Sequence, residues 1–287
     1  MKSITTLVDD IYALISKDKP LSEAQVEALG KSLTETLKRR LSDPPEPRGL
    51  SMSSIGSKCK RQLWYKINQP EKAEPLEPKA RLNFLAGDIW EEILLCLAKA
   101  AGHTVEGEQD ELELYGVKGH RDAVIDGVTV DVKTANSRSM EKFKNHDLEK
   151  DDPFGYLSQL SCYVTAAERV SDPLVQVRSE GAFLVADKER GGLTLDRYQL
   201  KPVSEDEVNA VKVLVSSKHP PARRYSPEPD GKSGNQVIPM PCRYCAFKET
   251  CWADANQGRG LLKYIFSSGP KWFTKIVRDP KPRVEQF

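Results

Sequence analysis

The chain has 287 residues, 39% of them hydrophobic and 30% charged, so it can bury a substantial core, and a peptide or miniprotein is excluded. Its longest apolar run, 93–98, has six residues against the roughly 20 of a membrane-spanning helix, so we expect no transmembrane segment. The 43 basic and 42 acidic residues nearly cancel, and no overall basic field indicates a nucleic acid. Residues 38–66 are locally basic and 103–131 locally acidic, which fits ordinary solvated faces as well as an acidic pocket beside a basic surface.

The N-terminal segment predicts helices. Residues 1–41 contain two helical stretches, the second opened by a capping box of Ser22 and Gln25, and a proline-rich break follows at 42–49. Two aspartates interrupt the first ten residues, where a signal peptide would be apolar. We therefore expect a cytoplasmic protein, of a bacterium or of a phage-infected host.

Two further helices are predicted next. A short helix is expected at about 59–66, and a long one runs from about 79 to 101 and ends at Gly102. Apolar residues at helical spacing predict the buried stripe of the long helix: Leu82, Leu85, Ile89, Ile93 and Leu97.

The middle of the chain changes from helical to alternating periodicity. The dipeptide Asp126-Gly127 separates two alternating runs, which is a strong hairpin signal. Mixed strand and helix order predicts an α/β core of one sheet flanked by helices. The expected strands are 111–115, 118–125, 128–133, 181–188 and 193–200, the expected helices 154–168 and 205–216, and 218–241 is an expected linker.

Carboxylates and a lysine are expected to meet in this hairpin. Residues two apart on a strand face the same side, so Asp122 lies with His120, and Asp131 lies with Lys133. In a suitable register these groups lie within roughly 5 Å, where carboxylate oxygens can hold Mg²⁺ or Mn²⁺ and the ammonium can position a water molecule. A plain turn with charges facing solvent fits the same residues.

Two helical features can extend this site. Glu91 lies in an apolar stretch, and a buried carboxylate needs a cation or a hydrogen bond. Gln159 and Tyr163 are four apart, so both can reach one ligand from the same helical face. Taken singly, a surface glutamate and an ordinary amphipathic helix explain these residues equally well.

Four of the six cysteines form a split set. Cys242, Cys245 and Cys251 are spaced C-x2-C-x5-C, and Cys59 stands 183 residues before the first of them. In a cytosolic chain such thiols are metal ligands more often than disulfides, and four thiolates can hold zinc or an iron–sulfur cluster. The remaining Cys96 and Cys162 are expected to be core thiols.

The order of these motifs resembles a known family. Gly-x3-Glu (87–91), GHRDAVID (119–126), DVK (131–133) and Gln-x3-Tyr (159–163) resemble the PD-(D/E)XK nucleases of the RecB type. One cysteine in a C-x-R context before the core and three after it resemble the branch that carries an iron–sulfur cluster, such as the AddB nuclease domain and the CRISPR adaptation nuclease. The resemblance covers about 53–252.

The resemblance implies the roles of the metal site. Asp122 and Asp131 would bind Mg²⁺ or Mn²⁺ together with the backbone carbonyl of Val132. Glu91 stands where many members have histidine and is a further expected ligand, and His120 is another.

The remaining site residues follow in the same way. Lys133 would be the catalytic lysine, with Gln159 and Tyr163 contacting DNA near the scissile phosphate, and Arg61 would contact DNA as well. Further phosphate or base contacts are expected from Arg259, Lys263, Lys271, Lys275, Arg278, Trp64, Tyr65, Tyr264 and Trp272, although the aromatic residues fit a core equally well.

The implied architecture is a restriction-endonuclease-like core, a mixed sheet flanked by helices, closed by an iron–sulfur clasp that joins N- and C-terminal segments. We expect a helical extension (1–50), a nuclease domain (51–252) and a basic tail (253–287). The clasp would be a [4Fe–4S] cluster, with zinc as the less favoured occupant, held by Cys59, Cys242, Cys245 and Cys251.

The expected function is that of a metal-dependent DNA exonuclease acting on single strands or DNA ends, in recombination, repair, or phage or CRISPR DNA processing. The chain carries no G-x4-G-K-[ST] motif, so strand separation would require a separate helicase or recombination protein. Two alternatives remain open: a non-catalytic DNA-binding or assembly subunit of the same fold, and a redox or zinc protein whose cysteines are the function.

Overall fold

A computed structural model describes residues 2–16, 21–41 and 49–281. The chain forms two compact units: unit 1 comprises Met1–Lys58 and Glu77–Lys212, and unit 2 comprises Cys59–Leu76 and Val213–Phe287. These divisions differ from the predicted domain boundaries, which stay predictions. Most of the proline-rich break predicted at 42–49 lies outside the described residues.

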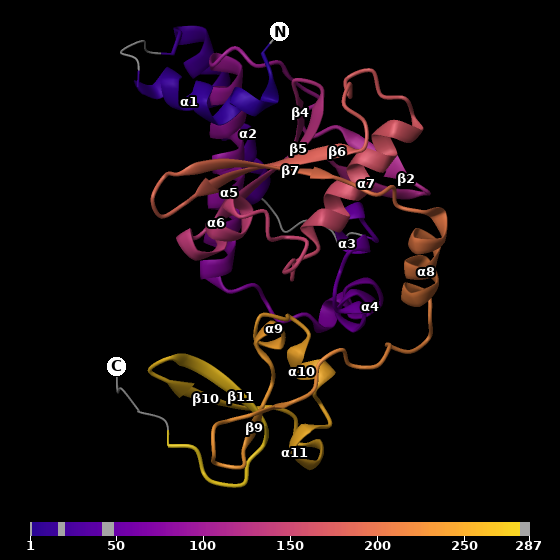
Figure 1. Cartoon of the computed structure of the whole chain (residues 1–287). Coiled ribbons are helices and arrows are strands. Elements are labelled where there is room, and N and C mark those ends of the chain that lie inside the picture. Colours follow the sequence, from indigo (N-terminus) through magenta and orange to yellow (C-terminus); the bar gives the residue numbers. More distant parts are fainter. Residues whose placement is uncertain (1, 17–20, 42–48, 282–287) are drawn as a thin grey trace. The chain divides into compact units, whose positions relative to one another are not determined.

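Unit 1 is built on a five-stranded mixed sheet (Figure 1). The strands β5 and β6 are parallel, and the other neighbours are antiparallel. This confirms the predicted mixed sheet. In spatial order the strands are β1 (Val105–Glu106), β4 (Ala123–Ile125), β5 (Val128–Ala135), β6 (Glu180–Asp187) and β7 (Leu193–Gln199).

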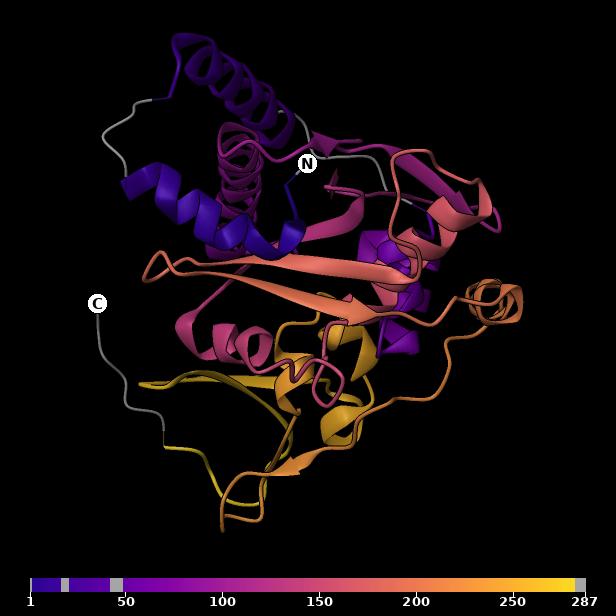
Figure 2. The same cartoon turned by 45° about the horizontal axis from the view of Figure 1, so that its top comes forward.

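Helices cover both faces of this sheet, because its central strands carry apolar side chains on both faces. Val130 and Leu184 pack against α1 (Leu7–Ser16) and α5 (Pro78–Ala100), whereas Phe183 lies on the opposite face. Figure 2 shows α1 and α6 on opposite sides of β6 and β7. The second face is covered by α6 (Ser137–Lys144), which the sequence did not predict, and α7 (Tyr156–Arg169).

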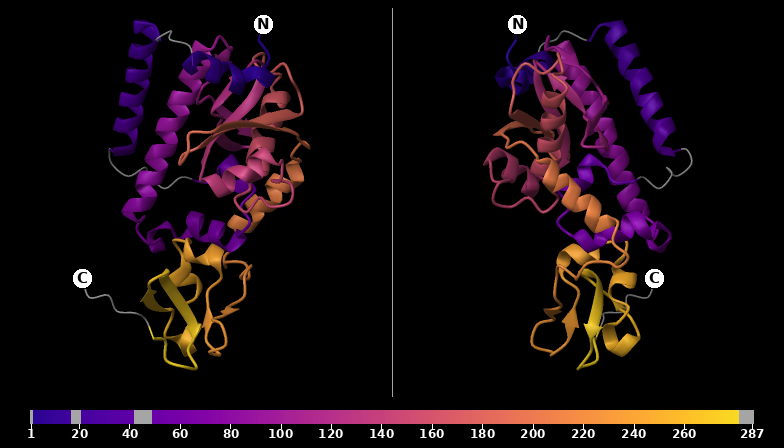
Figure 3. Two further views of the ribbon diagram at one scale, coloured as in Figure 1. Left: turned by 60° about the vertical axis from the view of Figure 1, so that its left-hand side comes forward. Right: turned by 90° about the vertical axis from the view of Figure 1, so that its right-hand side faces the viewer.

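The helix α2 (Glu23–Leu41) lies along α5 (Figure 3). Its predicted capping box is confirmed, since Gln25 N–H donates to Ser22 Oγ and Ser22 N–H donates to Gln25 Oε1, at 3.3 and 2.9 Å. The hydroxyl of Thr36 donates to Glu92 at 2.8 Å. Polar contacts therefore fix α2 to the flank of α5.

The predicted buried stripe of α5 is confirmed at Leu97, which packs against the core, and wrong at Leu82. The fully buried residues are Leu94, Leu95 and Ala98, whereas Leu82 is 67% exposed. The residues of α5 that pack in the core between this helix and the sheet lie in its C-terminal half: Trp90, Leu94, Leu95, Leu97 and Ala98. The stripe also shifts because α2 covers a second side of the helix.

The hairpin forms at the predicted turn, but its first strand is broken. Both Asp126 and Gly127 have positive φ, 47° and 79°, as a tight hairpin turn requires. The strand β3 (Val117–His120) pairs with β2 (Glu111–Leu114) in a separate two-stranded sheet, and β4 starts at Ala123. Asp122 therefore lies in the link between two sheets and not on one strand with His120.

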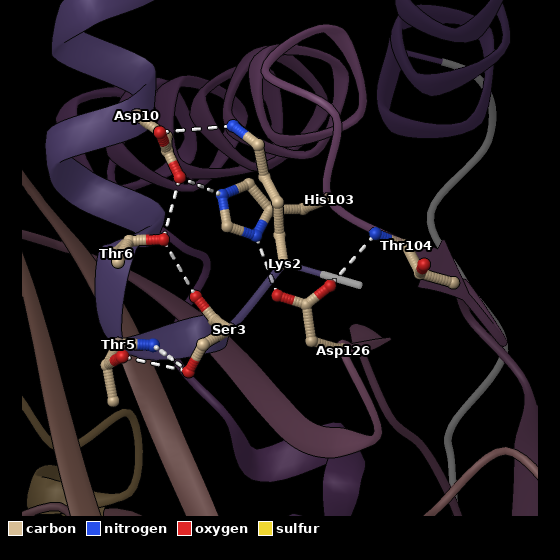
Figure 4. A network of polar contacts seen from close by, with 8 residues as sticks. All are labelled: Lys2, Ser3, Thr5, Thr6, Asp10, His103, Thr104 and Asp126. Carbon is tan, nitrogen blue, oxygen red and sulfur yellow. Dashed lines mark hydrogen bonds and ion pairs between the residues drawn. The ribbon is translucent and has the colours of Figure 1, made fainter.

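A buried histidine joins the N-terminal segment to this hairpin (Figure 4). His103 Nδ1 lies 2.6 Å from Asp126 Oδ2, and its Nε2 lies 3.1 Å from Asp10 Oδ2 on α1. Asp126 also accepts from Thr104 N–H at 3.0 Å, and Asp10 pairs with Lys2. The side chain of His103 is fully buried, so this network fixes α1 over the turn.

Three short elements complete unit 1. The helix α3 (Met52–Ile55) packs against the N-terminus of α7, where a Cβ added at Gly56 would lie 2.4 Å from Ser158 Cβ. Glycine is therefore required at this crossing. The helix α8 (Glu205–Val215) begins in unit 1, and a short 3-10 turn (Ile4–Thr6) precedes α1.

Unit 2 contains a small antiparallel sheet and short helices. The segment predicted as a basic tail includes a β-hairpin whose Trp272 and Phe273 are buried. No helix in the part of the chain that the structure describes is long and apolar enough to span a membrane. The helices are α4 (Lys60–Asn68), the 3-10 turn Pro70–Lys72, α9 (Met240–Arg243), α10 (Lys248–Cys251) and α11 (Ala255–Gly258), and the strands, in spatial order, are β10 (Leu262–Phe266), β11 (Gly269–Lys275), β9 (Gln236–Val237) and β8 (Glu228–Pro229).

Candidate active site

The centre of the candidate site is an ion pair on β5. Asp131 and Lys133 face the same side of the strand, and the Lys133 ammonium contacts Asp131 Oδ2. The Asp131 side chain is 1% exposed. Burial lowers the pKa of Lys133, but the charges of Asp131 and Asp122 outweigh this and raise it above its usual value. The lysine is therefore a fixed positive charge at neutral pH.

Asp122 joins this pair from the neighbouring link. Ala123 pairs with Val130 in the hairpin, so the next residue on each strand places Asp122 beside Asp131. Asp122 Oδ2 accepts from Val132 N–H at 2.7 Å. Burial raises the pKa of Asp122 well above its usual range, and the charges of Asp131 and Glu91 add to this. The site thus concentrates negative charge.

Glu91 reaches the same region from α5. Its Oε1 accepts from Gln109 Nε2 at 2.6 Å. Burial raises the pKa of Glu91 to about 7; the Gln109 hydrogen bond opposes this, and the charges of Glu92 and Asp131 add to it. Three carboxylates and one lysine leave an excess of negative charge, which a divalent cation would neutralise.

The structure also brings Gln159 and Tyr163 to this site. Gln159 Nε2 lies 3.2 Å from Asp131 Oδ1 and 3.3 Å from the Tyr163 hydroxyl. The two side chains therefore share one face of α7 beside the ion pair. Their contact with DNA stays a prediction.

Asp152, which was not among the predicted site residues, fixes the start of α7. Its carboxylate accepts from the N–H groups of Gly155, Tyr156 and Leu157, at 2.8, 2.9 and 3.0 Å. These are N–H groups that a helix start leaves without partners. An aspartate shortly before a predicted helix was the available signal.

Gln109 is a second residue that the sequence did not indicate. Its side chain binds Glu91, and its own N–H donates to the Asp122 carbonyl at 3.2 Å. The surrounding loop is fixed by Arg121, which is 1% exposed and pairs with Asp110 and Asp172 at 2.8 and 2.6 Å. Only tertiary structure reveals this link, because the glutamine lies in an irregular loop.

Two predicted residues have other contacts. The side chain of His120 is 51% exposed and lies 3.9 Å from Glu111 Oε2. Arg61, in unit 2, donates to the Pro221 carbonyl at 2.6 Å and to the Tyr65 hydroxyl at 3.2 Å. Their proposed roles towards metal and DNA stay predictions. Trp64, Tyr65 and Trp272 are core residues, as the alternative interpretation of the sequence held. Their side chains are buried and have no exposed face on which a base could stack.

All four cysteines of the split set belong to unit 2. Burial raises the pKa of Cys242 to about 12, and the neighbouring thiols of Cys245, Cys251 and Cys59 contribute. Burial likewise raises the pKa of Cys245 to about 11, with contributions from Cys59 and Cys251. Cys242 and Cys245 therefore lie within electrostatic range of each other and of both Cys251 and Cys59, although Cys59 is remote in sequence.

Neither predicted site is arranged as a finished metal centre. Within residues 2–16, 21–41 and 49–281, no group of three or more His, Cys, Asp or Glu side chains is placed to hold a metal ion. The carboxylates of Asp131, Asp122 and Glu91 are instead engaged by Lys133, Val132 N–H and Gln109. The donor chemistry of the carboxylate group nevertheless suits Mg²⁺ or Mn²⁺, and that of the thiols suits iron or zinc.

Comparison with known sequences assigns the family. Residues 11–252 match the PD-(D/E)XK nuclease superfamily. The chain belongs to this superfamily. Members of the PD-(D/E)XK superfamily are generally metal-dependent nucleases that use Mg²⁺ or Mn²⁺, so the chain is identified as a nuclease of this kind, with DNA as its expected substrate.

Two other comparisons add little. No curated protein matches the sequence. The structure titled "Crystal structure of SSO0001" is 17% identical, covers 77% of this chain and 93% of its own, and has a TM-score of 0.41, which is too low to bear on the fold.

Proposed function

We propose that this protein is a Mg²⁺- or Mn²⁺-dependent DNA exonuclease of the RecB type, acting on single strands or DNA ends. The convergence of Asp131 and Lys133 on β5 with Asp122, in the link before β4, supports this proposal most directly. A non-catalytic DNA-binding subunit would not need a buried lysine beside these carboxylates. The motif order that the chain shares with RecB-type nucleases supports the exonuclease assignment and a role in recombination, repair or phage or CRISPR DNA processing.

The carboxylates and a carbonyl would hold the cation. Asp122, Asp131, Glu91 and the Val132 carbonyl supply hard oxygen ligands. Burial raises the pKa values of Asp122 and Glu91, the charge of Asp131 adds to both, and a bound cation would balance this charge. When bound, the ion would supply Lewis acidity at the scissile phosphate and lower the pKa of a coordinated water.

The protein's own groups would orient the reactants. The Lys133 ammonium can donate hydrogen bonds to a water molecule or to a phosphate oxygen, which stabilises charge that develops during attack. Gln159 and Tyr163 can donate to phosphate oxygens from the adjoining helix face. Together these groups would align an in-line attack on the phosphodiester.

We further propose that Cys59, Cys242, Cys245 and Cys251 bind a [4Fe–4S] cluster. Their shared location within unit 2 supports a structural clasp between its two sequence segments. Four thiolates and an apolar surrounding that includes Trp252 and Trp272 fit such a cluster. A reducing cytoplasm would keep these thiols available. Absorbance near 400 nm with stoichiometric iron in anaerobic preparations would support this assignment, and stoichiometric zinc would contradict it.

The decisive experiment is digestion of end-labelled single- and double-stranded DNA with Mg²⁺ or Mn²⁺. We expect cleavage by the native protein that is abolished by chelator and reduced at least about 100-fold in Lys133→Ala, because one stabilising charge is lost. Lys31→Ala, which removes an exposed lysine of unit 1, is the matched control and should cleave normally. Equal cleavage by Lys133→Ala, or none by the native protein, would contradict the proposal.

A further inference from the structure

An exposed phenylalanine lies at the entrance to α7. Phe154 is 69% exposed, yet its ring stacks on Tyr156 with a centroid distance of 5.4 Å and an interplanar angle of 29°. Tyr156 in turn packs against Phe143 and Phe183 of the core, both at 6.3 Å. Phe154 is therefore the solvent-facing end of a row of aromatic rings.

The same row reaches the candidate site. The Lys133 ammonium lies 5.3 Å from the centroid of the Tyr156 ring. The Tyr156 ring therefore contacts both Phe154 and the Lys133 ammonium, the group that we propose to act on the scissile phosphate. Successive bases of a nucleic acid lie beside successive phosphates, so an aromatic surface at this place can meet a base next to that phosphate.

The loop holds Phe154 in place. Pro153 restricts the backbone before it, and Gly155 after it has a φ of 80°. The carboxylate of Asp152 binds three consecutive helix N–H groups, and Asp151 pairs with Lys142. Both acidic neighbours of Phe154 are therefore engaged, which reduces their repulsion of a phosphate backbone.

We propose that Phe154 is a stacking platform for one unpaired nucleobase beside the cleaved phosphodiester. This rests on the proposed nuclease function and specifies its substrate as a single strand or a frayed end. A paired base inside a duplex is covered on both faces by its neighbours, so only an unpaired base offers a free face. Stacking on aromatic residues tolerates any sequence, so we expect little sequence preference.

The test uses single-stranded oligonucleotides with 2-aminopurine at successive positions, whose fluorescence falls when the base stacks. Binding is measured with EDTA present, so that no cleavage occurs. For the native protein we expect quenching at one or two positions. We expect Phe154→Ala to lose this quenching and to bind the single strand about 5-fold to 100-fold more weakly, whereas Phe154→Trp keeps both properties.

Phe84→Ala is the matched control, because Phe84 is also in unit 1 and is 56% exposed. It should leave quenching and affinity unchanged. The proposal is overturned if Phe154→Ala quenches like the native protein, if Phe84→Ala has the same effect, or if no position is quenched. The two proposals can fail separately. If quenching depends on Phe154 but the protein cleaves no DNA with Mg²⁺ or Mn²⁺, the nuclease proposal is contradicted and the base-stacking proposal is supported.

Discussion

At the scale of single residues, the site is governed by an excess of carboxylate charge. Glu91, Asp122 and Asp131 share one region with a single lysine. Burial raises the pKa values of Glu91 and Asp122, and the neighbouring carboxylate charges raise them further. Protons and metal ions must therefore compete for the same oxygens.

This competition predicts a pH dependence of metal binding. Glu91, with a pKa of about 7 without metal, holds a proton in most molecules below that pH and must release it to bind an ion. Calorimetric titration with Mn²⁺ in the absence of DNA should show affinity falling below pH 7, by up to about tenfold per pH unit for one proton displaced. Glu91→Gln should weaken binding and flatten this dependence. Equal affinity at pH 6 and pH 8 would show that Glu91 is not a ligand.

The contact between Gln109 and Glu91 predicts that a substitution of Gln109 changes metal binding. Asparagine tolerates the φ of 56° at this position but is one carbon too short to keep the 2.6 Å contact with Glu91. Gln109→Asn should therefore fold normally, bind Mn²⁺ about 10-fold to 100-fold more weakly and shift its pH profile upwards. Thermal unfolding is the control. A lowered melting temperature with unchanged Mn²⁺ affinity would mean that Gln109 only supports the loop.

At the scale of elements, α7 depends on its cap. Asp152→Ala leaves three N–H groups at the helix start without their acceptor and should destabilise unit 1 by about 2 kcal/mol, measured by chemical denaturation. Asp152→Asn, whose amide oxygen can replace Oδ1, should lose less because it keeps the bonds from Gly155 and Tyr156. Equal stability of Asp152→Ala and the native protein would show that the cap is dispensable.

The N-terminal helix α1 depends on His103. His103→Ala leaves Asp126, 3% exposed, and Asp10 without their shared partner, and this should cost about 3 kcal/mol. We expect faster amide hydrogen exchange in α1 and near Asp126, whereas His219→Ala, at an exposed position, should change neither. Unchanged exchange in α1 would show that its apolar contacts suffice.

At the scale of the whole molecule, the chain separates two kinds of chemistry. The carboxylates and Lys133 belong to unit 1, and the four cysteines belong to unit 2. Cys242→Ser should therefore abolish the absorbance near 400 nm that we propose and increase proteolysis within unit 2, while Mn²⁺ affinity in unit 1 stays unchanged. Loss of both properties would mean that the two sites are coupled.

Local sequence determined the features that depend on neighbouring residues. The Ser22 capping box and the Asp126-Gly127 turn were predicted because each is made within four residues of chain. The superfamily also followed from the sequence, and residues 11–252 match it. Alternation on β5 placed Asp131 with Lys133 for the same local reason.

Tertiary structure decided what depends on partners remote in sequence. The buried Arg121, between Asp110 and Asp172, accompanies the break in the predicted strand before Asp122. The packing of α2 and the sheet on α5 selected its buried face, and the loop around Gln109 linked Glu91 to Asp122. Periodicity reports which residues share a face, but only the packed fold determines what that face meets.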